Sequence, residues 1–173
     1  MVLVPGVLAL LPEYAGEIDP VPELRAACRE AVGWLDGPVE VVAGDDRGRR
    51  VAQALLEEAR DGRREVSGDG EPTAYLVVGN GSACRTEKAP GHLDERAAGF
   101  DTSLGEALAS ADSAALADLD HDLAEELWAS TGAFGRLAEL LAAGPEGAVS
   151  TTVDYADDPF GVQYWVVRWT TPA

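Results

Sequence analysis

The chain is poor in basic residues, cysteine and histidine. Its 173 residues include one lysine, two cysteines and two histidines. Thirteen Lys and Arg stand against 31 Asp and Glu, so the formal net charge is −18. A surface of this sign repels nucleic-acid phosphates and anionic lipid. We therefore expect no nucleic-acid partner and no membrane role, and we interpret the scattered acidic residues as a solvated surface.

The scarcity of cysteine excludes a disulfide-stabilised scaffold. Cys28 and Cys84 stand far apart in the sequence, and they form no disulfide framework and no repeated metal-ligand spacing. This usage is typical of the reducing cytoplasm, which is the expected compartment. The apolar N-terminal stretch has no basic segment before it, contains Pro5 and Gly6, and is too short to span a bilayer. We interpret it as a buried first strand.

Alternating strand and helix patterns predict one domain over residues 1–173. Apolar runs bounded by Gly and Pro predict strands, and apolar residues at helical spacing predict helices. The expected fold class is α/β: a single-domain sandwich with a central, mostly parallel sheet flanked by helices and a C-terminal β-hairpin. The polar stretch Asp61–Pro72 is expected to be the most flexible connection. The predicted strands are Val2–Leu10, Val39–Val42, Tyr75–Val78, Val149–Tyr155 and Val162–Trp169, and the predicted helices are Glu23–Leu35, Val51–Arg60, Asp94–Ala109, Ser113–Leu119 and Asp122–Ala143.

One connection, Gly79–Asp101, gathers most of the chemically special side chains. It joins a predicted buried strand to a helix, a place where α/β proteins commonly carry functional residues. Gly79 and Gly81 could bring backbone amides close to an anion, and the alternative is a sharp turn off the sheet edge. The polar residues that follow the first glycines are Ser82, Cys84, Arg85, Thr86, Glu87, Lys88 and His92.

These side chains permit a functional and a structural interpretation. Arg85 and Lys88 could hold the anionic part of a ligand together with Ser82, while Glu87 acts as an acid or base. Alternatively, Glu87 pairs with Arg85 or Lys88 and braces the loop. His92 is the best candidate for a general base, because histidine titrates near physiological pH; the alternative is a surface residue at the helix entry.

Two further combinations are possible within the same connection. Cys84 and His92 could form a nucleophilic pair if they converged and a third group oriented the histidine. Cys84, His92, Asp94 and Glu87 could ligate zinc, although their spacing matches no familiar ligand pattern. Asp94 and Glu95 are better explained as carboxylates at a helix start.

The predicted hairpin contributes the remaining candidates. We interpret Asp157-Asp158-Pro159 as turn chemistry. The neighbouring Phe160 and Tyr164 could form the wall of a ligand pocket.

A family resemblance covers the second half of the chain. It rests on GNGSACRTEKAPGHLDERAAGFD at residues 79–101, the alanine-rich residues 112–127, and DYADDPFGVQYWVVRW at residues 154–169. With these stretches the chain resembles actinobacterial proteins of the class III extradiol ring-cleavage dioxygenase superfamily, those similar to its catalytic B subunit. The resemblance is specific over residues 74–173 and weaker over residues 1–62, and the domain looks shortened after its second strand.

The resemblance implies an α/β fold, frequent assembly as a dimer, and a non-haem iron(II) site. That site consists of two histidines and a glutamate, with a further histidine as acid/base. None of these side chains stands at its matching position: these positions are Leu3–Val7, 44–47, Ala83–Cys84 and Gly132–Arg136. We therefore expect no metal ligands, no cofactor and no iron-dependent ring cleavage.

Two functions from different classes remain. The first is a pseudoenzyme with a ligand-binding or assembly role, forming a dimer or other homo-oligomer and taking a small anionic or aromatic ligand through Ser82, Arg85, Lys88, Phe160 and Tyr164. The alternative is a metal-independent enzyme that transfers protons, as a lyase, isomerase or cyclase does, on a small aromatic or carboxylated substrate. In that case His92, Glu87 and Lys88 would be catalytic.

Overall fold

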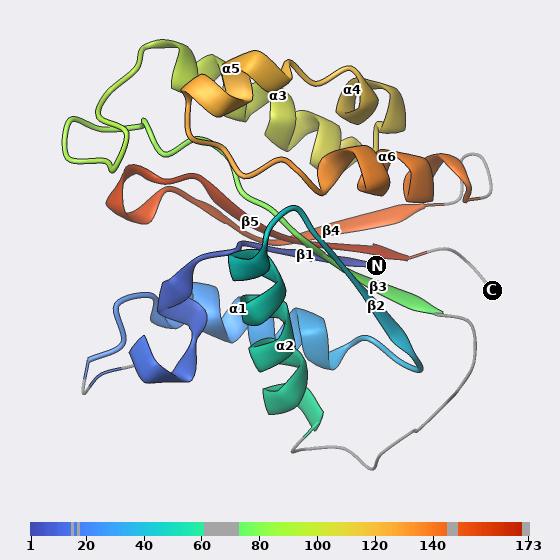
Figure 1. Cartoon of the computed structure of the whole chain (residues 1–173). Helices are drawn as coiled ribbons and strands as arrows, with labels where there is room; N and C mark the ends of the chain where they lie inside the picture. The colour runs from blue at the N-terminus through green and yellow to red at the C-terminus, as the bar shows by residue number, and fades with distance from the viewer. Residues whose placement is uncertain (15, 17, 61–72, 145–148, 171–173) are drawn as a thin grey trace.

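The computed structural model describes residues 1–14, 16, 18–60, 73–144 and 149–170, and it has an α/β architecture (Figure 1). The predicted flexible connection Asp61–Pro72 lies outside the described residues. The strands are β1 (Val2–Val4), β2 (Val39–Ala43), β3 (Ala74–Val78), β4 (Ser150–Asp157) and β5 (Tyr164–Thr170). The α-helices are α1 (Pro22–Gly33), α2 (Asp46–Arg60), α3 (Arg96–Ser110), α4 (Ser113–Ala117), α5 (His121–Glu126) and α6 (Phe134–Ala142), and the short 3₁₀ helices are η1 (Leu8–Leu10), η2 (Pro12–Tyr14) and η3 (Pro159–Gly161).

The five strands form one mixed sheet in the order β2-β3-β1-β5-β4. β3 pairs in parallel with both β1 and β2, whereas β5 pairs antiparallel with both β1 and β4. The expectation of a mostly parallel sheet therefore holds for one half of the sheet and not for the other. The predicted C-terminal hairpin is confirmed as β4–β5, with an irregularity in its register between Val153 and Tyr155.

Alternation of side chains along the strands gives each face of the sheet its own hydrophobic cluster. Val2 and Val4 point to the face covered by α1 and α2, and Leu3 points to the face covered by α3–α6 (Figure 1). In the same way, Tyr164 belongs to the first cluster and Trp165 to the second. The strand β1, whose three residues are all fully buried, lies at the centre of both.

Three predicted elements were wrong in their extent, and one of them is α2, which begins at Asp46 and not at Val51. The first strand ends at Val4, because Pro5 and Gly6 follow it, and the apolar residues beyond form η1. The long helix expected at Asp122–Ala143 is two helices, α5 and α6. Trp128 has a left-handed backbone (φ 57°), and the N–H of Ala129 closes α5 by donating to the carbonyl of Ala124 at 2.8 Å.

The helices of the described residues are short. None of them is both long enough and apolar enough to cross a membrane.

Candidate functional site

The segment that follows β3, residues 79–85, is hydrogen-bonded to two other parts of the molecule. On one side Asn80 exchanges two backbone hydrogen bonds with Ser130 (3.1 and 3.0 Å), and Ala83 N–H donates to Leu127 O at 2.9 Å. On the other side Gln163 accepts from Gly81 and donates to Ser82, both at 2.9 Å. The segment is therefore a hydrogen-bonded connector between the α5–α6 connection and the β4–β5 hairpin, and not a sharp turn.

Glycine is required in this connector because of close packing. A Cβ on Gly79 would overlap the ring of Phe134 and lie 2.7 Å from Ser130 O, and a Cβ on Gly81 would overlap Asp101 and lie 2.8 Å from the Trp165 ring. The amides that could have held an anion already have acceptors. Those of residues 79–82 donate, in order, to Val4 O, Ser130 O, Gln163 O and the Asp101 carboxylate.

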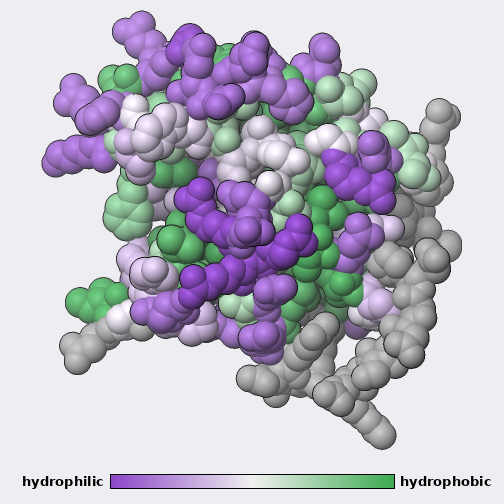
Figure 2. Space-filling view, in the orientation of Figure 1, coloured by the Kyte–Doolittle hydropathy of each residue, from purple (hydrophilic) through white to green (hydrophobic). Residues whose placement is uncertain are grey.

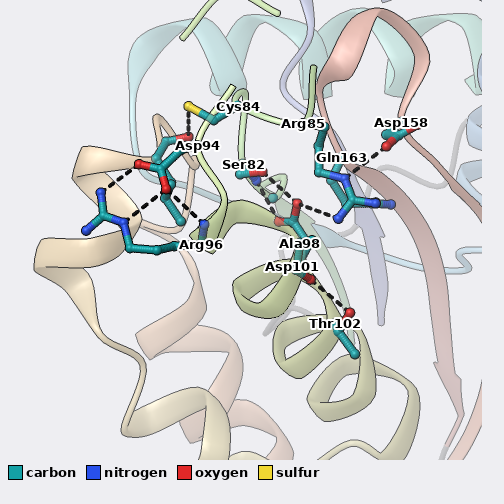
Figure 3. Close-up of polar contacts among 12 residues, drawn as sticks. Ser82, Cys84, Arg85, Asp94, Arg96, Ala98, Asp101, Thr102, Asp158 and Gln163 are labelled. Atoms are coloured by element: carbon teal, nitrogen blue, oxygen red, sulfur yellow. Dashed lines mark hydrogen bonds and ion pairs between the residues drawn. The ribbon is translucent and has the colours of Figure 1, made fainter. Parts of the chain in front are cut away.

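Ser82 and Asp101 form a buried polar pair at the centre of the site. Asp101, in the second turn of α3, accepts a hydrogen bond from Ser82 N–H (2.8 Å) on one carboxylate oxygen and from Ser82 Oγ–H (2.6 Å) on the other (Figure 3). Both residues are almost fully buried. Burial raises the pKa of Asp101, although the two hydrogen bonds from Ser82 act in the opposite direction.

Arg85 links the Ser82–Asp101 pair to the β4–β5 hairpin. Its Nε donates to Asp158 at 2.9 Å, and its Nη1 lies 3.8 Å from the Asp101 carboxylate (Figure 3). The guanidinium thus stands between two carboxylates from different elements. Glu87, which the sequence suggested as a partner of Arg85 or Lys88, forms no ion pair with either of them in the described part of the chain.

A second set of ion pairs holds the start of α3. Arg96 makes a bidentate pair with Asp94 (3.0 and 2.7 Å) and also reaches Glu126 of α5 at 2.7 Å. Arg96 lowers the pKa of Asp94 to about 2. Asp94 also accepts from the Arg96 N–H at 2.9 Å, so its predicted place at the start of this helix is confirmed.

Cys84 and His92 do not form a hydrogen-bonded pair with each other. The buried Cys84 thiol donates to Leu127 O at 3.4 Å, and burial together with the carboxylates of Asp94 and Asp101 raises its pKa. A raised pKa keeps the sulfur as a thiol, which is a poor nucleophile. His92 is exposed, and its Nδ1 lies 3.4 Å from Glu87 O.

The predicted site residues fall into three groups. Ser82 and Arg85 lie together in the buried network with Asp101. The side chains of Glu87, Lys88 and His92 lie on the exposed outer part of the connection. The two candidates from the hairpin, Phe160 and Tyr164, do not line one site. Phe160 is 66% exposed, whereas Tyr164 packs into the cluster beneath α1 and α2. Burial raises the pKa of Tyr164 to about 12.

Three residues around the connector have left-handed backbones: His92 (φ 60°), Trp128 (φ 57°) and Phe160 (φ 61°). This conformation costs a side-chain-bearing residue about 1–2 kcal/mol and persists where the surroundings impose it. Trp128 is 62% exposed and lies beside Gly91, whose Cβ would be 3.5 Å from the indole. This end of the molecule therefore displays two aromatic rings on a constrained backbone.

The family resemblance gives three positions for iron ligands and one for an acid/base histidine, and the residues at these four positions do not fit an iron site. None of those positions carries a histidine or a glutamate. Where β2 approaches α6, the main chains of Gly44 and Gly132 pack so closely that a Cβ on Gly44 would lie 2.8 Å from Gly132 Cα. Across the described ranges, no three His, Cys, Asp or Glu side chains gather where they could hold a metal ion.

Sequence reasoning missed two carboxylates of the site. Asp101 carried a usable signal, since it shares the buried face of α3 with Ala97, Leu104 and Leu108. An acid on an apolar helix face needs a buried partner. Asp158 was interpreted as turn chemistry alone, and it also pairs with Arg85, 73 residues away.

The raised pKa of Asp101 predicts a pH dependence of stability. Because the folded protein holds this proton more tightly than the unfolded chain, the contribution of Asp101 falls as pH rises from 3.8 through its folded pKa. The free energy of unfolding of the wild type, minus that of Asp101→Asn, should therefore decrease over this window. Urea denaturation of both proteins at a series of pH values measures it, and a difference that grows with pH would contradict the assignment.

Comparison with known proteins leaves the site to be interpreted from its geometry. No family model matches the chain, and no curated protein matches it.

Proposed function

We propose that this protein is a pseudoenzyme: a divergent protein of the extradiol dioxygenase fold that acts by binding or assembly, without an iron site, in the reducing cytoplasm. The observation that carries the proposal is that the connector at residues 79–85 is hydrogen-bonded to the rest of the protein. The backbone N–H groups of residues 79–83 and of Arg85 donate to acceptors within the protein, and the polar side chains of Ser82 and Arg85 are held by Asp101 and Asp158. Both cysteines are free thiols, in keeping with that compartment.

The catalytic alternative has weaker geometric support. Proton transfer requires an acid or base within hydrogen-bond reach of a bound substrate. His92, Glu87 and Lys88 are exposed to solvent, and the buried Asp101 and Cys84 already have hydrogen-bond partners in Ser82 and in the Leu127 carbonyl. Arg85 faces two carboxylates, which makes it a poor clamp for an anionic substrate.

The ligand or partner of such a protein would be apolar or aromatic rather than anionic. The rings of Trp128 and Phe160 are presented to solvent by a backbone held in a rare conformation. Aromatic rings of this kind are enriched in protein interfaces and in ligand contacts. A second copy of the chain is the partner that the family resemblance implies.

Oxygen consumption tests the absence of dioxygenase activity. Purified protein supplied with Fe(II) and catechol should consume no oxygen beyond the rate of a heat-denatured sample with the same iron and catechol. The denatured control is needed because free iron oxidises catechol. Iron-dependent uptake by the folded protein above that rate, with ring-opened product, would overturn the proposal.

A further inference from the structure

A pocket of about 340 Å³ lies between α3, α4 and the start of α5, on the face of the molecule away from the α1–α2 layer. Its walls are mainly apolar and come from Phe100, Leu104, Ala107, Leu119 and Leu123. This volume falls at the lower end of the range for small-molecule sites. In the space-filling view the surface over these helices is mostly hydrophilic, with hydrophobic residues showing between the polar ones (Figure 2).

The charged groups that line the pocket are both acidic. They are Asp118, which follows α4, and Asp120, which precedes α5. Asp120 uses one oxygen to cap α5, accepting from Leu123 N–H at 2.9 Å. The Asp118 carboxylate makes no hydrogen bond or ion pair within the described ranges. Two carboxylates without a basic neighbour in the lining leave this pocket complementary to a positive charge.

We propose that this pocket binds a small organic cation with an apolar body. The body, of about the size of one aromatic ring with a short chain, would lie against Phe100 and Leu104, and its ammonium group would face Asp118 and Asp120. An ammonium donates to carboxylates through charge-assisted hydrogen bonds, the stronger kind. This inference rests on the proposed binding role and adds a ligand site whose lining does not include the exposed rings of Trp128 and Phe160.

Gly99 of α3 offers a way to fill the pocket without damaging the fold. It lines the pocket, and a Cβ added to it would meet no atom within 4 Å. Leucine is a much better helix former than glycine, so Gly99→Leu places a side chain in open space and favours the helix. Gly135 of α6 is equally open and lies outside the pocket lining, so Gly135→Leu is the matched control.

The experiment measures binding of 2-phenylethylamine, 3-phenylpropionate and 2-phenylethanol by isothermal titration and ligand-observed NMR at low salt. The amine should bind best and more weakly as salt is added. Asp118→Asn should weaken amine binding about threefold, with Asp122→Asn, a carboxylate of α5 outside the lining, as its control. Gly99→Leu should abolish binding, and Gly135→Leu should leave it unchanged.

Three results would overturn the inference: no amine binding, equal binding of the propionate, or equal effects of the two leucine variants. Each of these leaves the oxygen-consumption test untouched. Conversely, iron-dependent oxygen uptake in a protein that still binds the amine would refute the proposed function and leave the pocket standing. Circular dichroism of each variant distinguishes lost binding from lost structure.

Discussion

Replacing Asp101 with alanine is expected to lower the free energy of unfolding by about 3 kcal/mol, because it leaves buried polar partners without an acceptor. Asp101 is 3% exposed and accepts from both the N–H and the hydroxyl of Ser82. The loss would also leave the guanidinium of Arg85 with only Asp158. Urea denaturation measured by tryptophan fluorescence and by circular dichroism gives the value.

Two further variants define what the Asp101 result means. Thr102→Ala changes the next residue of α3, which is exposed and whose hydroxyl, among the described residues, bonds only to the Ala98 carbonyl of its own helix, so it should cost less than about 0.5 kcal/mol. A double-mutant cycle of Ser82→Ala with Asp101→Ala should show strong coupling, since the two share both hydrogen bonds. If Asp101→Ala costs no more than Thr102→Ala, the buried pair does not stabilise the connector.

Replacing Gly79 with alanine is expected to cost about 2–3 kcal/mol through overpacking. The added Cβ would overlap the ring of Phe134, which is fully buried, and press on Ser130 O. Neither group can move freely, because Ser130 is itself paired with Asn80. Thermal and urea unfolding would show the loss as a lower melting temperature and a lower urea midpoint.

A second-site variant tests whether overlap with the Phe134 ring causes the loss of stability in Gly79→Ala. Phe134→Leu removes part of the ring that the new methyl group meets, so Gly79→Ala with Phe134→Leu should be less destabilised than the sum of the two single variants. Gly135→Ala is the control for adding a methyl group to an unobstructed glycine, and it should stabilise α6 by about 0.5–1 kcal/mol. Additive losses for Gly79 and Phe134 would contradict the overlap.

The fold was predictable where the signal is local. Apolar runs marked β2 and β3 to within a residue or two, and apolar residues at helical spacing marked α1. The break between α5 and α6 was not predictable in this way. The left-handed turn at Trp128 lies where Ser130 pairs with Asn80, a contact between residues 50 positions apart that a helical pattern does not reveal.

The candidate site was predictable in position and not in chemistry. The residues between β3 and α3 were correctly singled out as a polar connection, and Ser82 and Arg85 do lie in one network. The burial of Ser82 and the exposure of Lys88 and His92 have a physical reason. Ser82 lies where the chain is paired on both sides, whereas Lys88 and His92 lie where it leaves that pairing and turns outward. A sequence cannot show where such long-range pairing stops.

The pairing of residues 79–85 has a consequence for the order in which the protein folds. Cys84 bonds to Leu127 across 43 residues, and Arg85 to Asp158 across 73. Contacts of such sequence separation require large loops to close before they contribute any energy. We therefore expect the connector to take its final path late, after β3, α5 and the hairpin have met. The hydrogen bonds of the connector would then be among the last of the native structure to form.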